Sequence, residues 1–285
     1  MTDAGARRVL MTPRFLDCNG RRLFALDVAP AQGAPHAAVL YLPPFAEEMN
    51  RCRVHAANTA RHLAGLGWRC LLLDPFGTGE STGEIHEPTW AMWLADAQVA
   101  FTWLAGQSGQ VPALWGMRTG ALLASDLFSQ LHAGAGPLPT RLLFWQPVHD
   151  GKLFLNQYLR LRLASQLVHE GARETTDIIR ARLAKGQLVE IAGYPLSGAL
   201  ADGLAAQRMA APQVLAQRPL DLLEILAQPG QEPSLPNRKL ADAVRGAGGA
   251  VQISGVVAPF IWQSSDRADA RQLAQATLRL LGLTP

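Results

Sequence analysis

Short apolar runs alternate with helical segments along most of this 285-residue chain. Runs of strand length lie at 22–28, 37–42, 68–74, 111–115, 141–146, 219–226 and 250–256. Segments with helical periodicity lie between most of them, at 51–65, 88–105, 119–132, 236–246 and 265–282. A strand-helix-strand order of this kind predicts an α/β protein with a mostly parallel central sheet and helices on both faces.

One stretch, residues 149–218, breaks the alternation. Its pattern is helical, with GYPLSG as an interruption, and the alanine-rich part at 199–217 also indicates helix. An insertion after a strand of a parallel sheet lies over the carboxyl ends of the strands, where open α/β folds bind ligands. We therefore predict a core formed by 1–148 and 219–285, with a helical cap at 149–218.

The composition indicates a globular protein, because 48% of the residues are hydrophobic and only 17% are charged. The net charge of +3 comes from scattered basic residues without interleaved aromatic side chains, so we expect no nucleic-acid partner. Three cysteines without paired spacing imply neither a disulfide framework nor a zinc site. We find no apolar run of signal-peptide or transmembrane length, and we expect a cytoplasmic protein without metal or organic cofactor.

The segment PALWGMRTGALLA, residues 112–124, has the frame of a nucleophile elbow. In the elbow G-x-S-x-G, the nucleophilic serine lies on a sharp turn between a strand and a helix. Here Gly116 and Gly120 flank Arg118 instead. A guanidinium stays protonated and only donates hydrogen bonds, so Arg118 can neither attack a carbonyl nor accept a proton.

A second motif follows the apolar run that ends at Asp74, in LLLDPFGTGESTGE. Gly77, Gly79 and Ser81 complete a pattern that resembles the D-x-x-G-x-G-x-S loop common after a central strand of α/β hydrolases. The alternative is a phosphate cradle, but the segment lacks the further glycine and the lysine of phosphate-binding loops.

With this loop, the elbow frame and the cap, the chain resembles an α/β hydrolase. More narrowly, LPPFAEEMNRCR, LWGMRTGALLA, FWQPVHDGKLFLNQYLRLRLA and APFIW resemble the type 2 hydrolase associated with exosortase A systems. Those proteins are hydrolase-like members of bacterial gene clusters for exopolysaccharide synthesis and surface-protein sorting. The resemblance covers most of the chain after residue 15. It implies the α/β-hydrolase fold and, nominally, a hydrolase of esters, thioesters or amides, although fold alone does not give function.

A Ser-His-acid triad cannot be completed at the usual positions of that fold, which follow the order nucleophile, acid, histidine. At the acid position, PGQEPSLP offers Glu232, whose alternative interpretation is a solvated loop glutamate. At the histidine position, GVVAPFIW has Pro259 or its neighbours, and no histidine occurs after His169. Loss of nucleophile or base alone removes most triad catalysis, so a surviving acid restores nothing.

An arginine at the amino end of a helix needs an anionic partner, because the helix dipole repels a cation there. The loop PPFAEEMNR supplies Glu47 and Glu48, and we expect Arg118 to pair with one of them. The pair is either a structural lock, or it leaves Arg118 partly free to hold a carboxylate or phosphate of a ligand. Trp262 is a further candidate ligand-binding residue, as part of an aromatic wall for a sugar or acyl chain, or it is core packing.

Other residues offer a relocated nucleophile. Cys52 and His55 lie three residues apart on a predicted helix, as a thiolate-imidazole pair or as ordinary packing and surface residues. His149 follows a strand on the ligand side of the sheet, where it is a candidate base for Ser81 or Ser197.

Three functions therefore stay open. The first is a degenerate hydrolase that binds a small-molecule or acyl ligand, or a protein partner, in an exosortase-linked pathway. The second is an active hydrolase with a relocated nucleophile, which requires a serine or cysteine within hydrogen-bond reach of a histidine. The third is a structural subunit whose cap packs directly onto the sheet.

Overall fold

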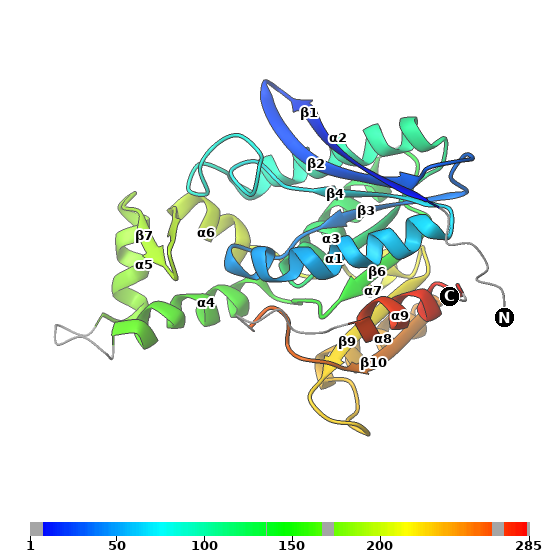
Figure 1. The fold of residues 1–285 in the computed structure, drawn as a ribbon. Coiled ribbons are helices and arrows are strands. Elements are labelled where there is room, and N and C mark those ends of the chain that lie inside the picture. The colour runs from blue at the N-terminus through cyan, green and yellow to red at the C-terminus, as the bar shows by residue number, and fades with distance from the viewer. Residues whose placement is uncertain (1–7, 135, 167–173, 264–270, 284–285) are drawn as a thin grey trace.

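The structure, a computed structural model, describes residues 8–134, 136–166, 174–263 and 271–283. Its centre is an eight-stranded sheet in the order β1-β2-β4-β3-β5-β6-β9-β10 (Figure 1). The strands are β1 (Val9–Cys18), β2 (Arg21–Pro30), β3 (Ala37–Leu42), β4 (Trp68–Leu73), β5 (Ala113–Met117), β6 (Leu142–Trp145), β9 (Leu220–Leu226) and β10 (Val251–Val257). Pairing is parallel from β4 to β10, and only β1 with β2 and β2 with β4 run antiparallel. The predicted mostly parallel sheet is confirmed.

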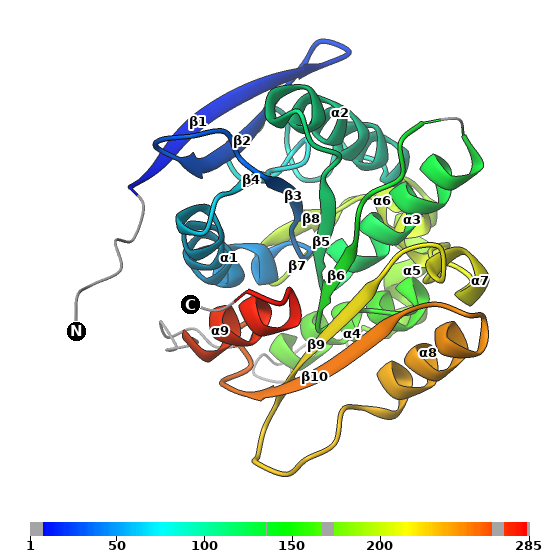
Figure 2. The ribbon, with the colours of Figure 1, turned by 90° about the vertical axis from the view of Figure 1, so that its right-hand side faces the viewer.

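Helices cover both faces of the sheet, as predicted (Figure 2). One face carries α1 (Glu47–Gly65) and α9 (Arg271–Leu280), and the other carries α2 (Trp90–Ser108), α3 (Thr119–Ala133) and α8 (Leu235–Gly246). Successive side chains of a strand point to opposite faces. Leu114 of β5 therefore packs with the buried hydrophobic side chains of α2 and α3, while Trp115 packs with those of α1 and α9. This two-sided burial explains why the central strands are continuously apolar.

Most elements between β6 and β9 project past the carboxyl ends of the parallel strands (Figure 1). They are α4 (Gly151–Gln166), α5 (Thr176–Ala184), β7 (Val189–Ile191), β8 (Tyr194–Leu196) and α6 (Gly198–Ala205), whereas the short helix α7 (Pro212–Leu215) lies beside α3 and α8 (Figure 2). All of them lie inside the stretch 149–218. We call this group of elements the cap.

The structure corrects several details of the sequence interpretation. The prediction missed β1, whose residues are mostly exposed and which contains Pro13, a residue tolerated in an edge strand. The interruption GYPLSG belongs to a small hairpin, in which β7 and β8 turn at Ala192 and Gly193 with positive φ angles. The helix predicted for 265–282 begins within the described residues at Arg271, since residues 264–270 lie outside them.

The alanine-rich segment 199–217 is not one helix, because its chain leaves the helical path after Ala205. Backbone bonds to the start of the cap replace helical bonds there: Gly151 N donates to Gln207 O at 3.0 Å, and Met209 N donates to His149 O at 2.9 Å. A second, short helix begins at Pro212, whose missing N–H is tolerated in a first turn.

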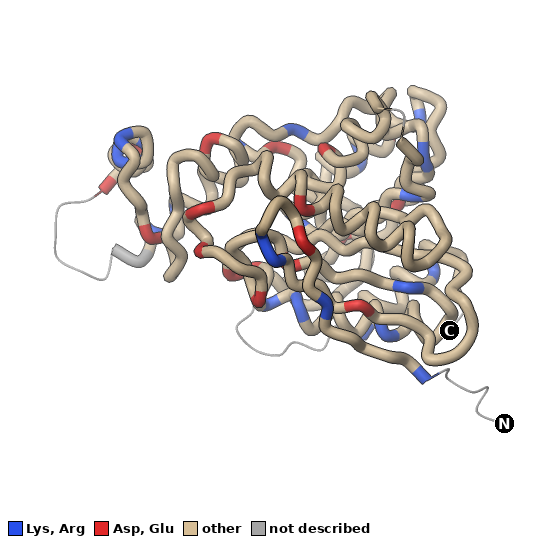
Figure 3. The backbone as a smooth tube through the Cα atoms, turned by 90° about the horizontal axis from the view of Figure 1, so that it is seen from above, with Lys and Arg blue, Asp and Glu red and all other residues tan. Residues whose placement is uncertain are grey.

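Acidic and basic positions are interspersed along the backbone in the view of Figure 3. Within the described ranges, no helix combines the length and the apolar character that a membrane crossing requires.

Candidate functional site

The turn between β5 and α3 keeps the backbone of a nucleophile elbow. Arg118 has φ 54° and ψ −118°, a conformation that non-glycine residues rarely adopt. A Cβ atom on Gly116 would lie 2.5 Å from the Cα atom of Ala121, and one on Gly120 would lie 2.1 Å from the carbonyl oxygen of Leu42. Both glycines are therefore required for the close approach of strand and helix, and they place the side chain of residue 118 at the carboxyl end of the sheet.

Arg118 forms a two-bonded ion pair with Glu48, in the first turn of α1. Its Nε atom donates to Oε2 of Glu48 at 3.2 Å and its Nη2 atom donates to Oε1 at 3.0 Å. The two side chains are 16% and 20% exposed. Burial raises the pKa of Glu48 above its ordinary value, and the neighbouring guanidinium opposes that rise. Of the two carboxylates considered from the sequence, Glu48 is the partner of Arg118.

Two aromatic rings flank the same guanidinium. Its Cζ atom lies 5.0 Å from the ring centroid of Trp262 and 5.9 Å from that of Phe154. Such contacts between a cation and a π face are favourable. Trp262 follows β10, in the segment where a triad of this fold would have its histidine, and Phe154 comes from α4 of the cap. The elbow arginine is thus held by one carboxylate and two rings from three separate parts of the chain.

Glu47 has a different role, at the junction of α1 and the cap. It accepts a hydrogen bond from the Tyr194 hydroxyl at 2.7 Å and another from Nε of Arg51 at 3.2 Å. The bond from Tyr194 is the main cause that lowers the pKa of Glu47. Since Tyr194 belongs to β8, this carboxylate fastens the cap hairpin to the start of α1.

Side chains fill most of the space beside the elbow. Phe45, after β3, has ring contacts with Trp93 at 5.9 Å, Phe154 at 6.2 Å and Tyr158 at 5.0 Å between centroids. The cavity at the elbow's rim has a volume of about 20 Å³. Its walls come from the β3–α1 loop, the 75–78 loop, α2 and the start of α3. A cavity of this size holds about one water molecule.

The predicted acid, Glu232, lies on the surface. Its side chain is 73% exposed and pairs with Arg238 at 2.7 Å. A different carboxylate, Glu224 of β9, is buried. Its Oε2 atom accepts bonds from N and Oγ of Ser234 at 2.9 and 3.1 Å and from Nδ2 of Asn237 at 2.6 Å. Sequence reasoning missed Glu224, although a glutamate inside the apolar run LDLLEIL is itself a signal.

His149 is joined to this buried carboxylate through an amide. Its Nε2 atom lies 2.6 Å from Oδ1 of Asn237, whose Nδ2 atom donates to Glu224. Burial lowers the pKa of His149, which favours the neutral ring. In that form Nε2 carries the proton and donates to Asn237, because an amide oxygen only accepts. The contact fixes the tautomer and orientation of the imidazole.

The candidate nucleophiles are either hydrogen-bonded to the backbone, as the two serines are, or buried and protonated, as Cys52 is. Ser81 donates to the carbonyl oxygen of Asp74 at 2.5 Å and accepts from the backbone N–H of Phe24 at 2.8 Å. Ser197 accepts from the backbone N–H of Leu200 at 3.3 Å and caps α6. Cys52 is fully buried, and burial raises the pKa of its thiol far above the ordinary value, so the thiol is protonated at neutral pH.

His55 is half-buried on α1, the helix that also carries Cys52. Within the described part of the chain, no group of three His, Cys, Asp or Glu side chains has an arrangement that would hold a metal ion.

Neither a family model nor a curated protein matches the chain in sequence. Solved structures match it in fold. Est1E from Butyrivibrio proteoclasticus with bound ferulic acid is 14% identical, with a TM-score of 0.65 over 94% of this chain and 97% of that chain. A putative hydrolase from Agrobacterium vitis S4 is 17% identical, with a TM-score of 0.57 over 96% and 99% of the two chains. An esterase of the bacterial hormone-sensitive lipase family is 18% identical, with a TM-score of 0.56 over 95% and 82%. The chain has the α/β hydrolase fold.

Proposed function

We propose that this chain uses the α/β hydrolase fold to bind a small ligand or a partner protein, without hydrolysis at its elbow. The observation that carries the proposal is the pairing of Arg118 with Glu48 between the rings of Trp262 and Phe154. A guanidinium supplies no lone pair for attack on a carbonyl. The indole of Trp262 cannot accept the proton that a histidine base would take.

The contacts of Arg118 favour a structural lock over a ligand anchor. One edge of the guanidinium is bonded to Glu48 and aromatic rings flank it. A satisfied buried network of this kind specifies one geometry of the surrounding elements. In this function, the lock joins the elbow, α1, the segment after β10 and the cap, and it sets the surface that a ligand or partner recognises.

The resemblance of several sequence segments to exosortase A-associated hydrolases favours a place for this binding function in exopolysaccharide synthesis or surface-protein sorting. The ferulic acid held by the Est1E structure supports a small-molecule ligand on this fold. A cytoplasmic location is proposed with it, since Cys18, Cys52 and Cys70 are all free and buried.

Hydrolysis assays test the proposal. Purified wild-type chain, Arg118→Ser and the double variant Arg118→Ser with Glu48→Gln are given 4-nitrophenyl butyrate and an acyl thioester. The double variant removes the carboxylate that Arg118→Ser leaves without its partner, and circular dichroism checks that each protein is folded. We expect no turnover above the buffer rate from any of them, because a serine without a base is a poor nucleophile.

One result of these assays would contradict the binding proposal. Turnover by the wild type that persists in Arg118→Ala and disappears in His149→Ala or Cys52→Ala would establish a relocated active site, and the binding proposal would fail.

A further inference from the structure

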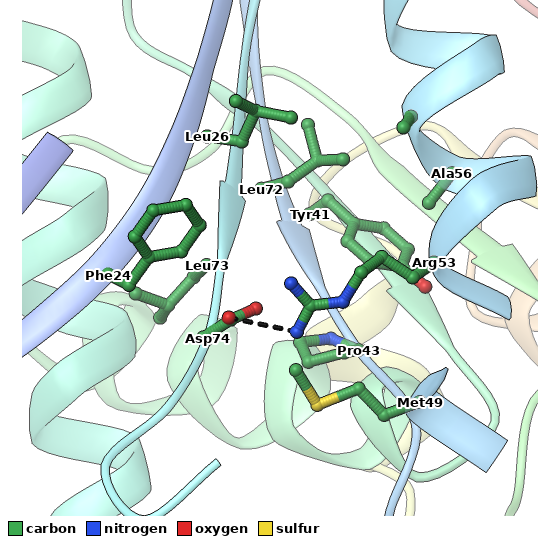
Figure 4. Close-up of a pocket in the computed structure, with 11 residues that line it drawn as sticks. Phe24, Leu26, Tyr41, Pro43, Met49, Arg53, Ala56, Leu72, Leu73 and Asp74 are labelled. Atoms are coloured by element: carbon green, nitrogen blue, oxygen red, sulfur yellow. Dashed lines mark hydrogen bonds and ion pairs between the residues drawn. The ribbon is translucent and has the colours of Figure 1, made fainter. Parts of the chain in front are cut away.

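A second cavity, separate from the elbow, lies between α1 and the strands β2, β3 and β4 (Figure 4). Its volume is about 130 Å³. The strands contribute the side chains of Phe24, Leu26, Tyr41 and Leu72, which are apolar apart from the Tyr41 hydroxyl. Above them α1 presents Ala56 and Ala57, whose small side chains leave the space open.

One end of this cavity is polar. Arg53 reaches from α1 toward Asp74, at the end of β4, and its Nη2 atom donates to Oδ2 of Asp74 at 2.9 Å (Figure 4). The same carboxylate oxygen accepts from the backbone N–H of Glu80 at 3.0 Å. Asp74 is nearly buried, whereas the Arg53 side chain is 38% exposed. Leu26 and Leu72 lie at the end of the cavity away from Asp74 (Figure 4).

The loop after β4 is shaped around this ion pair. A Cβ atom on Gly79 would lie 2.0 Å from Oδ2 of Asp74 and 2.4 Å from Nη2 of Arg53. Any side chain at this position would therefore push the two charged groups apart. The second glycine of the D-x-x-G-x-G-x-S pattern thus serves the polar end of this cavity.

The charges and dimensions of the cavity select a class of ligand. A cavity of about 150 Å³ with apolar walls binds benzene in an engineered protein, so the space here suits one ring or a short aliphatic chain. The charges of Arg53 and Asp74 cancel, so a ligand carboxylate would face the Asp74 carboxylate and a ligand ammonium would face the guanidinium. An uncharged oxygen of a ligand would be repelled neither by the Asp74 carboxylate as an anion nor by the guanidinium as a cation.

Arg53 has donors to offer such an oxygen. A guanidinium carries five N–H groups, and the bond to Asp74 is the only one that Arg53 makes among the described residues. We infer that this cavity binds a small uncharged molecule, with an aromatic ring or short aliphatic chain against the strands and one hydroxyl or carbonyl oxygen that accepts from Arg53.

Binding in this cavity does not require a particular chemistry at the elbow. None of the side chains around the cavity contacts the guanidinium of Arg118 in the interactions described above. The two sites are neighbours, since Pro43 and Met49 line both cavities. Binding here is compatible with a hydrolytic or a non-hydrolytic elbow.

Three matched compounds test the inference on the full chain: benzyl alcohol, toluene and benzoate. Binding is followed by titration in ¹H–¹⁵N TROSY spectra. We expect benzyl alcohol to bind about tenfold more tightly than toluene or benzoate, because a hydrogen bond from a charged donor favours the hydroxyl. The backbone signals that shift should be those of α1 near Ala56 and of β2 and β4.

Variants of α1 provide the controls. Ala57→Leu fills the cavity and is expected to reduce the affinity for benzyl alcohol at least tenfold, whereas Asn58→Leu places the same side chain at the next, exposed position and leaves it unchanged. Arg53→Met together with Asp74→Leu removes both polar groups at this end of the cavity and should bring the affinity for benzyl alcohol down to that for toluene. Thermal unfolding confirms that each variant is folded. The inference is overturned if no compound binds, if benzoate binds as tightly as benzyl alcohol, or if Ala57→Leu has no effect.

Discussion

Arg118 occupies a backbone conformation that this fold uses to present a nucleophile, with φ 54°, although its side chain cannot act as one. The conformation persists because Gly116 and Gly120 allow β5 and α3 to pack closely, and that packing does not depend on the chemistry of residue 118. The need of Arg118 for an anion could be predicted from the sequence. The choice between Glu47 and Glu48 could not, because adjacent residues of a helix point in directions about 100° apart. Only the orientation of α1 against the elbow decides it.

Replacement of Glu48 by glutamine should destabilise the protein by about 2 kcal/mol, because it leaves a mostly buried guanidinium without a counter-charge. The matched variant Glu47→Gln changes a carboxylate that is 40% exposed and should cost about 0.5 kcal/mol. Urea unfolding at pH 7 measures both. Equal effects of the two variants would show that the pair with Arg118 does not act as a lock.

Among helices and strands, the alternating pattern was enough to predict the parallel part of the sheet and the helices that cover it. Elements outside that pattern were missed. β1 has an edge position, a proline and few buried residues, so its strand character comes from its pairing with β2. The short hairpin of β7 and β8 is likewise stabilised by contacts that are distant in sequence, such as the bond from Tyr194 to Glu47. The partners of His149 were hidden for the same reason, since Asn237 lies 88 residues away.

The strand β9 contains a second buried carboxylate, Asp221, with a measurable consequence for stability. Its Oδ2 atom lies 3.2 Å from Nε of Arg141 but has no hydrogen-bond partner among the described residues. Burial raises the pKa of Asp221 to about 6, and Arg141 opposes the rise. The folded state therefore holds this proton more tightly than the unfolded state, whose carboxyl has a pKa of about 4. The stability that this group contributes is present below pH 4 and is lost as the pH rises to 6.

The substitution Asp221→Asn should remove this loss of folding stability between pH 4 and pH 6. We expect the variant to be more stable than the wild type by about 1 to 3 kcal/mol at pH 8, and the difference to shrink as the pH falls from 6 to 4. Urea unfolding at pH 4, 5, 6 and 8 gives the comparison. A variant that is less stable than the wild type at pH 8 would mean that the ion pair with Arg141 outweighs the cost of burial.

The chain as a unit combines a complete α/β hydrolase fold with an elbow region that its own side chains fill. The cap contributes Phe154 and Tyr158 to that filling, and the cavity left at the rim has a volume of about 20 Å³. A cavity of about 130 Å³ lies next to it, beneath α1. The likeness to the three solved structures named above, at 14 to 18% identity, is a likeness of fold alone. The side chains at the elbow, Arg118 and Trp262 among them, support the proposal that no hydrolysis takes place there.

The sharpest test of a non-hydrolytic elbow is covalent labelling of the folded wild-type protein by a fluorophosphonate, which reacts with activated serines, read out by intact mass and peptide mapping. We expect no adduct under conditions that label an active serine esterase completely. Ser81 and Ser197 in particular should stay unmodified, because their hydroxyls are bonded to the backbone. A stoichiometric adduct on either serine, abolished by His149→Ala, would contradict the account and identify a working nucleophile with its base.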